Sequence, residues 1–217
     1  MNEYQSELDL SIIIPAYKEA YKIEQDIRAA ADFLATQGLA GEILVVDDGS
    51  PDETAKRAKA LEADFPALRV LSYEQNRGKG YALRHGITHS RGKNVMFADA
   101  GLCVPYDIAL IGLTMVNLRM CDVAMGSRRM RGSILRQQPL YRRIGSKVYG
   151  WVIHTIMGVP WYISDTQCGF KIYRGDVARR LYTLAFTDGF MFDIEIILRS
   201  LGEGYRILEF PVLWSND

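Results

Sequence analysis

The chain has 217 residues, of which 48% are hydrophobic and 24% are charged. This balance excludes a disordered or fibrous protein, and the length suits one α/β domain over residues 1–217. The 26 basic and 26 acidic side chains give zero net charge, so we expect no general attraction to nucleic acid.

The first half of the chain alternates short apolar runs with helical patterns. Strands are predicted at residues 10–14, 43–46, 68–73 and 94–98. A first helix has apolar residues from Ile23 to Leu34 at helical spacing, and it ends near Gly38. A second helix follows Ser50-Pro51-Asp52-Glu53, which has the pattern of a capping box with Ser50 as N-cap. A third helix is predicted at 81–89.

The second half of the chain is less regular. Its predicted strands are 122–126, 170–173 and 205–214, and its predicted helices are 140–157, 175–184 and 192–201. Uniformly apolar strands separated by helices predict an α/β fold, with a mostly parallel sheet flanked by helices on both faces. Ligands of such sheets bind beyond the carboxyl ends of the strands. The segments at these ends are 15–19, 47–50, 74–80 and 99–101.

The charge of the chain is unevenly distributed. Residues 123–164 contain no Asp or Glu, and their seven basic side chains give +7 against −7 elsewhere. These side chains are Arg128, Arg129, Arg131, Arg136, Arg142, Arg143 and Lys147. A solvated surface run is one interpretation. Because surfaces usually mix signs, a site for an anion, for an anionic membrane surface or for both is the other.

The cysteines and the termini indicate the compartment. The chain has three cysteines, Cys103, Cys121 and Cys168, which form no CxxC or Cys/His cluster. We therefore expect neither a zinc site nor a disulfide framework. Such a small, odd number of cysteines also predicts that the protein resides in a reducing compartment. The N-terminus is polar and acidic, unlike a signal peptide. The longest stretch without charge, residues 148–164, contains two glycines and a proline, so it predicts no spanning helix.

Asp47-Asp48-Gly49-Ser50 ends the second predicted strand. A plain strand-to-helix turn explains Gly49 and Ser50. It leaves two adjacent carboxylates at the mouth of an apolar sheet, where they need hydrogen-bond donors or cations. Ribose hydroxyls and a base N–H are suitable donors, so we favour a ligand-binding role for this segment.

Two further strand ends leave alternatives open. Asn76-Arg77-Gly78-Lys79-Gly80 is neither a dinucleotide fingerprint nor a P-loop. Its glycines and cations before a helix suit either a phosphate or a structural turn. Asp99 follows the fourth predicted strand, where a single carboxylate suits either a metal ligand or a helix cap.

The spacing of these segments together is more specific than any one alone. They are Pro15–Glu19 (PAYKE), Asp47–Ser50 (DDGS), Asn76–Gly80 (NRGKG), Asp99–Ala100, Gly126–Arg128 and Asp165–Lys171 (DTQCGFK). From about Leu10 onward the chain resembles family 2 glycosyltransferases of the GT-A fold. In particular it resembles their polyprenyl-phosphate branch, which includes the dolichyl-phosphate glucosyltransferases and mannosyltransferases. DTQCGFK and Phe190–Glu195 are most similar to the glucosyltransferase side.

The resemblance implies a role for each matching residue. The residues implied to bind a nucleotide sugar are Pro15, Tyr17, Glu19, Val46 (beside the base), Asp48, Asp99 and Ala100. Lys79 is added to them as a candidate because it is a cation before a helix, where a phosphate would be suited. Asp99 is also implied to hold Mg²⁺ or Mn²⁺. Arg128, Arg142 and Ser146 are implied to grip the phosphate of an acceptor, within the basic segment 123–164.

The chain departs from the family pattern at two positions and at its end. The family usually has Asn at the position of Lys18, and it has the second carboxylate of a DxD motif where this chain has Gly101. Relatives also continue past the position of Asp217, with a further basic loop and often with membrane helices.

We therefore expect an enzyme that moves a hexose, with inversion, from a nucleotide sugar of the UDP-glucose or GDP-mannose type to a polyprenyl or dolichyl phosphate. It would act at the cytoplasmic face of a membrane, with Asp99 and Arg128 as catalytic residues. Two alternatives remain. One is transfer to a saccharide hydroxyl with Asp165 as base, and the other is a non-catalytic nucleotide-sugar-binding protein, because the DxD motif is incomplete.

Overall fold

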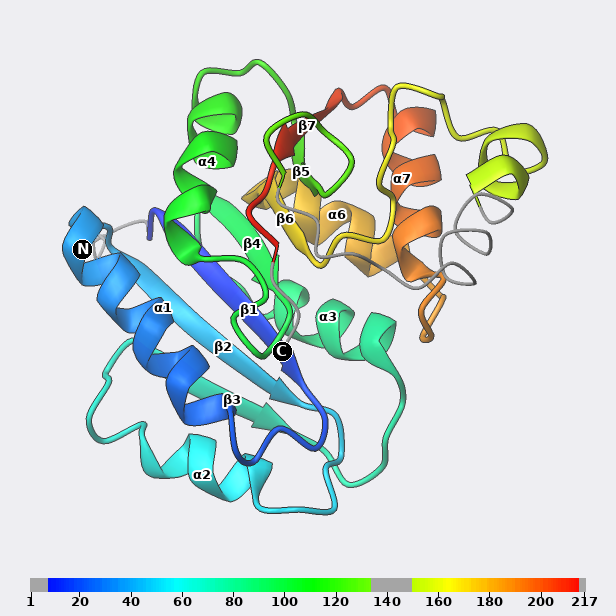
Figure 1. Ribbon diagram of the computed structural model, residues 1–217. Coiled ribbons are helices and arrows are strands. Elements are labelled where there is room, and N and C mark those ends of the chain that lie inside the picture. Colours follow the sequence, from blue (N-terminus) through cyan, green and yellow to red (C-terminus); the bar gives the residue numbers. More distant parts are fainter. Residues whose placement is uncertain (1–7, 134–149, 215–217) are drawn as a thin grey trace, which may run out of the picture.

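The computed structural model describes residues 8–133 and 150–214, and within these ranges the chain forms one seven-stranded sheet. The strands are β1 (Leu10–Ala16), β2 (Gly41–Asp47), β3 (Leu68–Ser72), β4 (Asn94–Ala98), β5 (Val123–Ser127), β6 (Phe170–Arg174) and β7 (Ile207–Pro211). Their order across the sheet is β3-β2-β1-β4-β6-β5-β7. β6 runs antiparallel to both of its neighbours, and every other pair is parallel (Figure 1). The mostly parallel sheet predicted from the sequence is confirmed.

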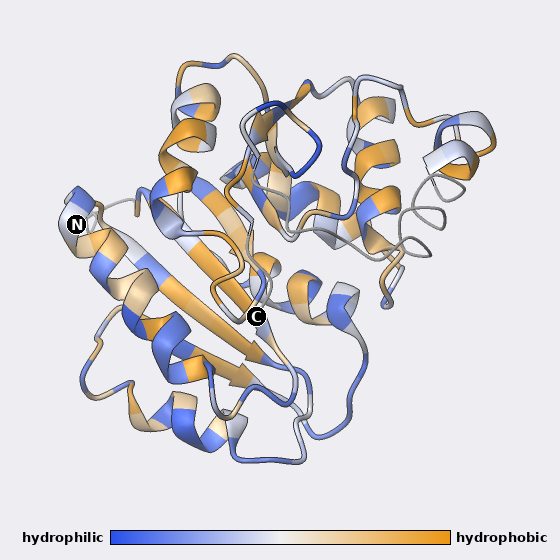
Figure 2. Ribbon diagram, in the orientation of Figure 1, coloured by the Kyte–Doolittle hydropathy of each residue, from blue (hydrophilic) through white to orange (hydrophobic). Residues whose placement is uncertain are grey.

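Helices cover both faces of this sheet, as predicted. They are α1 (Ile23–Gln37), α2 (Thr54–Ala60), α3 (Lys79–Thr88), the short 3₁₀ helix η1 (Tyr106–Ile108), α4 (Ala109–Asn117), α6 (Gly175–Leu184) and α7 (Phe192–Gly202), with residues 150–155 also helical. One apolar core lies under α1, α2 and α4, and a second lies under α3, α6 and α7. Figure 2 shows the strands between these layers as almost uniformly hydrophobic.

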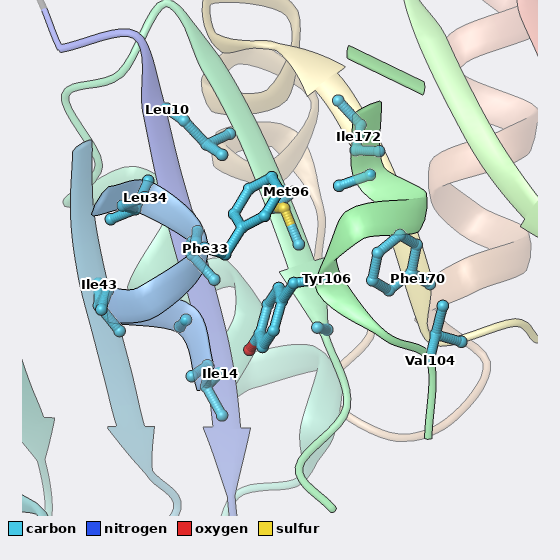
Figure 3. Packing of buried hydrophobic residues seen from close by; sticks show 14 of the residues in the cluster. Leu10, Ile14, Phe33, Leu34, Ile43, Met96, Val104, Tyr106, Phe170 and Ile172 are labelled. Atoms are coloured by element: carbon cyan, nitrogen blue, oxygen red, sulfur yellow. The ribbon is translucent and has the colours of Figure 1, made fainter. Parts of the chain in front are cut away.

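The strands supply both cores by alternation. In β1, Ile12 and Ile14 point into the first core and Ile13 into the second, and all three are fully buried. Figure 3 shows the first core, where Phe33 of α1 and Tyr106 of η1 lie against the sheet with stacked rings 6.0 Å apart. Burial on both faces explains why the strands read as unbroken apolar runs rather than as alternating ones.

Two local predictions were wrong. The capping box at Ser50 does not form, because α2 begins at Thr54 and the Asp52 carboxylate accepts the Thr54 N–H at 3.1 Å. Ser50 Oγ instead accepts the backbone N–H of Lys18, which ties the end of β1 to the end of β2. The final strand is shorter than predicted, since β7 covers only Ile207–Pro211.

One helix has no predicted counterpart, and another lies partly beyond the described residues. α4 is almost entirely apolar, so its sequence lacks the polar face by which an amphipathic helix is recognised. The predicted helix 140–157 is described only from residue 150 onward, where residues 150–155 are helical. No helix within the described ranges is long and apolar enough to cross a lipid bilayer.

Candidate active site

A cavity of about 500 Å³ opens beyond the carboxyl ends of β1, β2 and β4. Seven of the eight residues predicted to bind a nucleotide sugar line it. They are Pro15, Tyr17, Glu19, Asp48, Lys79, Asp99 and Ala100. Cys103 and Phe190 also line it, and neither was predicted as a binding residue. The cavity is within the usual size range of small-molecule sites.

The eighth predicted residue is excluded from the cavity. Val46 is fully buried in the core between the sheet and α3, close to Ile13 and Gly86. Its position within β2 gives it this direction, because side chains alternate along a strand. The Val46 side chain therefore does not line the cavity, and the predicted place of Val46 beside a base stays a prediction.

The buried carboxylate of Asp48 holds the 73–78 segment at the rim of the cavity through hydrogen bonds. Its Oδ1 accepts hydrogen bonds from Tyr73 Oη and Arg77 N, and its Oδ2 accepts them from Asn76 Nδ2 and Gly78 N, all at 2.8–2.9 Å. The residue is only 4% exposed. Four bonds fill the acceptor positions of a carboxylate. Asp48 thus fixes the loop that carries Lys79, and its predicted contact with a base or ribose stays a prediction.

The glycines of the 76–80 segment serve a close approach within the protein. A Cβ on Gly80 would lie 2.4 Å from the carbonyl oxygen of Thr187, and one on Gly78 would lie 2.6 Å from that of Asp188. The same Asp188 oxygen accepts the Tyr81 N–H at 3.2 Å. The 187–188 segment therefore covers the start of α3. Of the two interpretations of these glycines, a phosphate site or a structural turn, the contacts favour the structural turn.

Lys79 itself points into the cavity and meets Asp99. Their Nζ and Oδ1 atoms are 2.5 Å apart, with the side chains 20% and 37% exposed. The Asp99 carboxylate rests on the Cα of Gly169, because a Cβ there would lie 1.9 Å from Oδ2. Asp99 N also donates to Gly169 O at 3.0 Å. The DTQCGFK segment thus supplies the surface on which the carboxylate lies.

The position of the missing DxD carboxylate is occupied by an internal anchor. Gly101 has φ of 97°, a backbone conformation that glycine adopts readily and an aspartate would not. Its N–H and that of Leu102 donate to the buried Asp26 carboxylate of α1 at 2.9–3.0 Å. An aspartate substituted here would strain the loop instead of simply completing a metal site.

The donor atoms at this position do not fit a metal site that the protein forms alone. Mg²⁺ and Mn²⁺ prefer several oxygen ligands. Here one carboxylate, Asp99, is already in contact with an ammonium group. Among the residues that the structure describes, no three His, Cys, Asp or Glu side chains are grouped to hold a metal ion.

Arg128 and Asp165 form a second polar centre, after β5 and before β6. Arg128 Nε and Nη2 donate to the two oxygens of Asp165 at 2.7 and 2.8 Å, and Asp165 is 4% exposed. The guanidinium lies 5.7 Å from the ring of Trp214, and Trp214 shares a small recess with Asp99. The two centres are thus neighbours, although Arg128 does not line the cavity.

The contact with Arg128 affects whether Asp165 can act as a general base. Burial alone would raise the pKa of Asp165, but the hydrogen bonds and charge of Arg128 outweigh it and hold the pKa below its ordinary value. A general base works best with a pKa near the operating pH. Asp165 therefore serves to hold Arg128, and the structure argues against the predicted alternative role.

A buried ion pair links the two sequence segments that most resembled the family. Lys171 of β6 contacts Asp193 of α7 and donates to the carbonyl oxygen of Thr166. Lys171 is 1% exposed and Asp193 5%. Burial raises the pKa of Asp193, against the opposing charges of Lys171 and Lys79. The pair fixes DTQCGFK against α7 beneath the Asp99–Lys79 contact.

A family model described as Glycosyl transferase family 2 matches residues 11–182 of this chain. The chain belongs to glycosyl transferase family 2. Its curated relatives are glycosyltransferases, and so is this protein. It is 31% identical to a dolichyl-phosphate beta-glucosyltransferase of Saccharomyces cerevisiae, over 100% of this chain and 70% of the relative. It is 30% identical to the Drosophila melanogaster protein of the same name, over 96% of this chain and 68% of the relative.

A solved structure shows the same fold. The glucosyl-3-phosphoglycerate synthase of Mycobacterium tuberculosis, in complex with Mn²⁺, UDP and glucosyl-3-phosphoglycerate, superposes on this glycosyltransferase with a TM-score of 0.72. The sequences are 20% identical, and the match covers 97% of this chain and 73% of the other. The GT-A-like fold predicted for this family 2 member is confirmed.

The structure explains the two positions at which the chain departs from the family pattern. Two other predicted residues lie outside the part of the chain that it describes. Lys18 has φ of 62°, in the left-handed region where asparagine is enriched, which accounts for the usual Asn at this position. Gly101 turns its N–H toward Asp26, as described above. Arg142 and Ser146, predicted to bind the acceptor phosphate, lie outside the described residues.

We expect Asp26 to make the stability of this glycosyltransferase pH-dependent. Burial raises the pKa of Asp26 from 3.8 to about 6, although the Gly101 and Leu102 N–H groups oppose the shift. The folded state therefore holds the proton more tightly than the unfolded state. This contribution is fully present below pH 3.8 and is lost as the pH rises through 6, a total of about 3 kcal/mol.

Asp26→Asn tests this expectation in urea unfolding at a series of pH values from 4 to 7. The stability of the variant relative to wild type should rise by about 2–2.5 kcal/mol over that range, since Asn has no proton to lose. Asp32→Asn, an exposed position on the same helix, is the control and should show little change. A constant difference between Asp26→Asn and wild type would contradict the assignment.

Proposed function

We propose that this glycosyltransferase moves a hexose from a nucleotide sugar to a polyprenyl phosphate such as dolichyl phosphate, as one catalytic domain spanning residues 1–217. The observation that supports the donor half is the cavity at the strand ends, where seven residues from four separate segments converge. The relatives named dolichyl-phosphate beta-glucosyltransferase support the acceptor half and favour UDP-glucose over GDP-mannose as the first donor to test.

The proposed reaction is a single in-line displacement with inversion. A phosphate oxygen of the acceptor forms a bond to the anomeric carbon, while the bond from that carbon to the diphosphate breaks and its electrons leave with the nucleoside diphosphate. A phosphate monoester has a second pKa of about 6, so the nucleophile is already mostly a dianion at neutral pH. The proposed acceptor thus needs no strong base, which agrees with the engagement of Asp165 by Arg128.

The proposed acceptor side is the basic segment 123–164. The bidentate contact with Asp165 fixes the Arg128 guanidinium beside Trp214, and guanidinium groups suit phosphate oxygens. Arg142 and Ser146 remain part of this proposal. If a divalent ion, Mg²⁺ or Mn²⁺, takes part, Asp99 is the ligand that the described residues offer, and diphosphate oxygens would have to supply the rest.

The proposed setting is the cytoplasmic surface of a membrane. Three aromatic side chains in the uncharged stretch after the basic run are exposed: Trp151 by 56%, Trp161 by 68% and Tyr162 by 60%. Tryptophan and tyrosine are enriched at membrane interfaces, where a polar and an apolar phase meet. Exposed aromatic residues beside a basic segment support attachment of the protein at the surface that presents a lipid phosphate.

The incomplete DxD motif favours one alternative, a protein that binds a nucleotide sugar without transferring it. The deciding experiment incubates the protein with labelled UDP-glucose or GDP-mannose and a short-chain polyprenyl phosphate, with the matching polyprenol as the control. We expect a lipid-linked hexose to form with the phosphate and not with the alcohol. Binding of the donor without turnover would favour the alternative of a non-catalytic binding protein. Transfer to the alcohol alone would favour the hypothesis that the acceptor is a hydroxyl group.

A further inference from the structure

The cavity contains an unusual balance of charge. Its described lining has three carboxylates, those of Glu19, Asp48 and Asp99, and one cationic side chain, Lys79. A nucleoside diphosphate is itself strongly anionic. The site therefore needs positive charge near the place where the diphosphate lies. Lys79 is the cation that the described lining provides.

Two other cationic side chains close to Lys79 in sequence are engaged away from the cavity. The guanidinium of Arg77 stacks on Tyr81 at 3.6 Å from the ring centroid, and that of Arg84 pairs with Asp188. The first turn of α3 faces the carbonyl oxygens of the 187–188 segment. Neither of the two guanidinium groups lines the cavity.

Lys79 is held in place as a preorganised cation. Its Nζ is 2.5 Å from Asp99 Oδ1 and lies about equally far from the rings of Phe97 and Phe192, at 6.0 and 5.9 Å. Its side chain is only 20% exposed. Two aromatic rings and one carboxylate restrict the position of the ammonium within the cavity. Such preorganisation increases the electrostatic effect of a charge, because no reorganisation is needed when the ligand arrives.

The same geometry disfavours a divalent ion. In a DxD site two carboxylates share the metal, whereas here Gly101 replaces one and Lys79 contacts the other. A divalent cation bound to Asp99 would lie against an ammonium of the same sign and would have to displace it. The residues present therefore fit a lysine-based site better than a metal-based one.

We propose that Lys79 supplies the positive charge for the diphosphate, so that this protein binds a nucleoside diphosphate without a divalent ion. The inference rests on the proposed donor class and goes beyond it. The ammonium donates hydrogen bonds to diphosphate oxygens and keeps its protons throughout. When the bond to the anomeric carbon breaks, the added negative charge on the leaving diphosphate is stabilised by Lys79. Asp99 is then a positioning residue for Lys79.

Calorimetric titration of UDP and GDP into the wild-type protein, in excess EDTA or in Mn²⁺, tests the inference. For whichever diphosphate binds more tightly, the Kd measured in EDTA and the Kd measured in Mn²⁺ should differ by less than about threefold. In EDTA, Lys79→Met should weaken the binding of this diphosphate at least about tenfold, the loss expected for a hydrogen bond to a charged group. The affinity for the corresponding nucleoside monophosphate should fall less on the same substitution. Lys56→Met removes the same charge from an ion pair on the exposed surface and should leave both affinities unchanged.

Asp99→Asn separates the two accounts of the site. If Lys79 is the cation, this variant keeps its affinity in EDTA or gains some, because a negative charge beside the diphosphate is removed. If Asp99 holds an essential metal, wild type binds only with Mn²⁺ and Asp99→Asn loses that binding, which overturns the inference alone. Wild-type protein that binds neither UDP nor GDP in either buffer would sink the proposed donor and the inference together. Should Lys79→Met fail to fold, Lys79→Met/Asp99→Asn removes both charges and should bind the diphosphate as weakly in EDTA.

Discussion

Gly169→Ala is expected to lower the turnover number of hexose transfer about 100-fold, a typical cost of misplacing a reacting group by about 1 Å. The new Cβ would lie 1.9 Å from Asp99 Oδ2 and 2.4 Å from Oδ1, so the carboxylate must move. Its contact with Lys79 is then lost or displaced. The atoms in conflict belong to the end of one side chain, so the protein should still fold with a melting temperature close to that of wild type.

The measurement is steady-state transfer with the donor and acceptor identified in the screen above, together with thermal unfolding. Gly202→Ala is the matched control, since a Cβ on this residue at the end of α7 would meet nothing within 4 Å. That variant should keep wild-type turnover. Normal turnover in Gly169→Ala would mean that the placement of the Asp99 carboxylate does not matter to the reaction.

Lys171→Met is expected to destabilise the folded protein by about 3–5 kcal/mol, the usual cost of removing one partner of a buried ion pair. Lys171 is 1% exposed and Asp193 5%, so the remaining carboxylate has little access to water. Burial already raises the pKa of Asp193, and loss of Lys171 raises it further. The deficit should therefore shrink as the pH falls, because Asp193 takes up a proton in the folded state.

Urea unfolding at several pH values measures this effect, and a double variant shows its origin. Lys171→Met/Asp193→Leu replaces both charges by apolar side chains and should recover at least half of the lost stability. Lys56→Met, in an ion pair whose side chains are 79% and 56% exposed, should cost less than about 1 kcal/mol. Equal losses in the single and double variants would show that packing, not the orphaned charge, dominates.

The sequence predicted the sheet well because its signals are local. Strands buried on both faces are recognisable as apolar runs, and Gly38 does end α1 with φ of 62°. The failures are also local in origin. Ser50 has the residue pattern of a capping box, yet its hydroxyl bonds Lys18 N instead. α4 lacks the polar face that would have revealed it.

The site was predicted in membership but less well in roles. Strand ends identified the cavity residues, because the carboxyl ends of parallel strands meet at one edge. Sequence patterns could not show that Asp48 is saturated by the 73–78 loop, that Asp165 is engaged by Arg128, or that Asp99 contacts Lys79. These pairings join segments far apart in the chain, so no local spacing encodes them.

The antiparallel direction of β6 has a consequence for where the chain can vary in length. β5 ends at Ser127 and β6 begins at Phe170, and the two strands pair antiparallel. The connection between them, residues 128–169, therefore leaves the sheet and returns to it at the same edge, the one where the cavity opens. We infer that the part of this connection between Arg128 and Asp165 can change in length without disturbing the register of the sheet. A change in this one stretch would thus alter what lies beside the cavity, while the ends of β1, β2 and β4 kept their places.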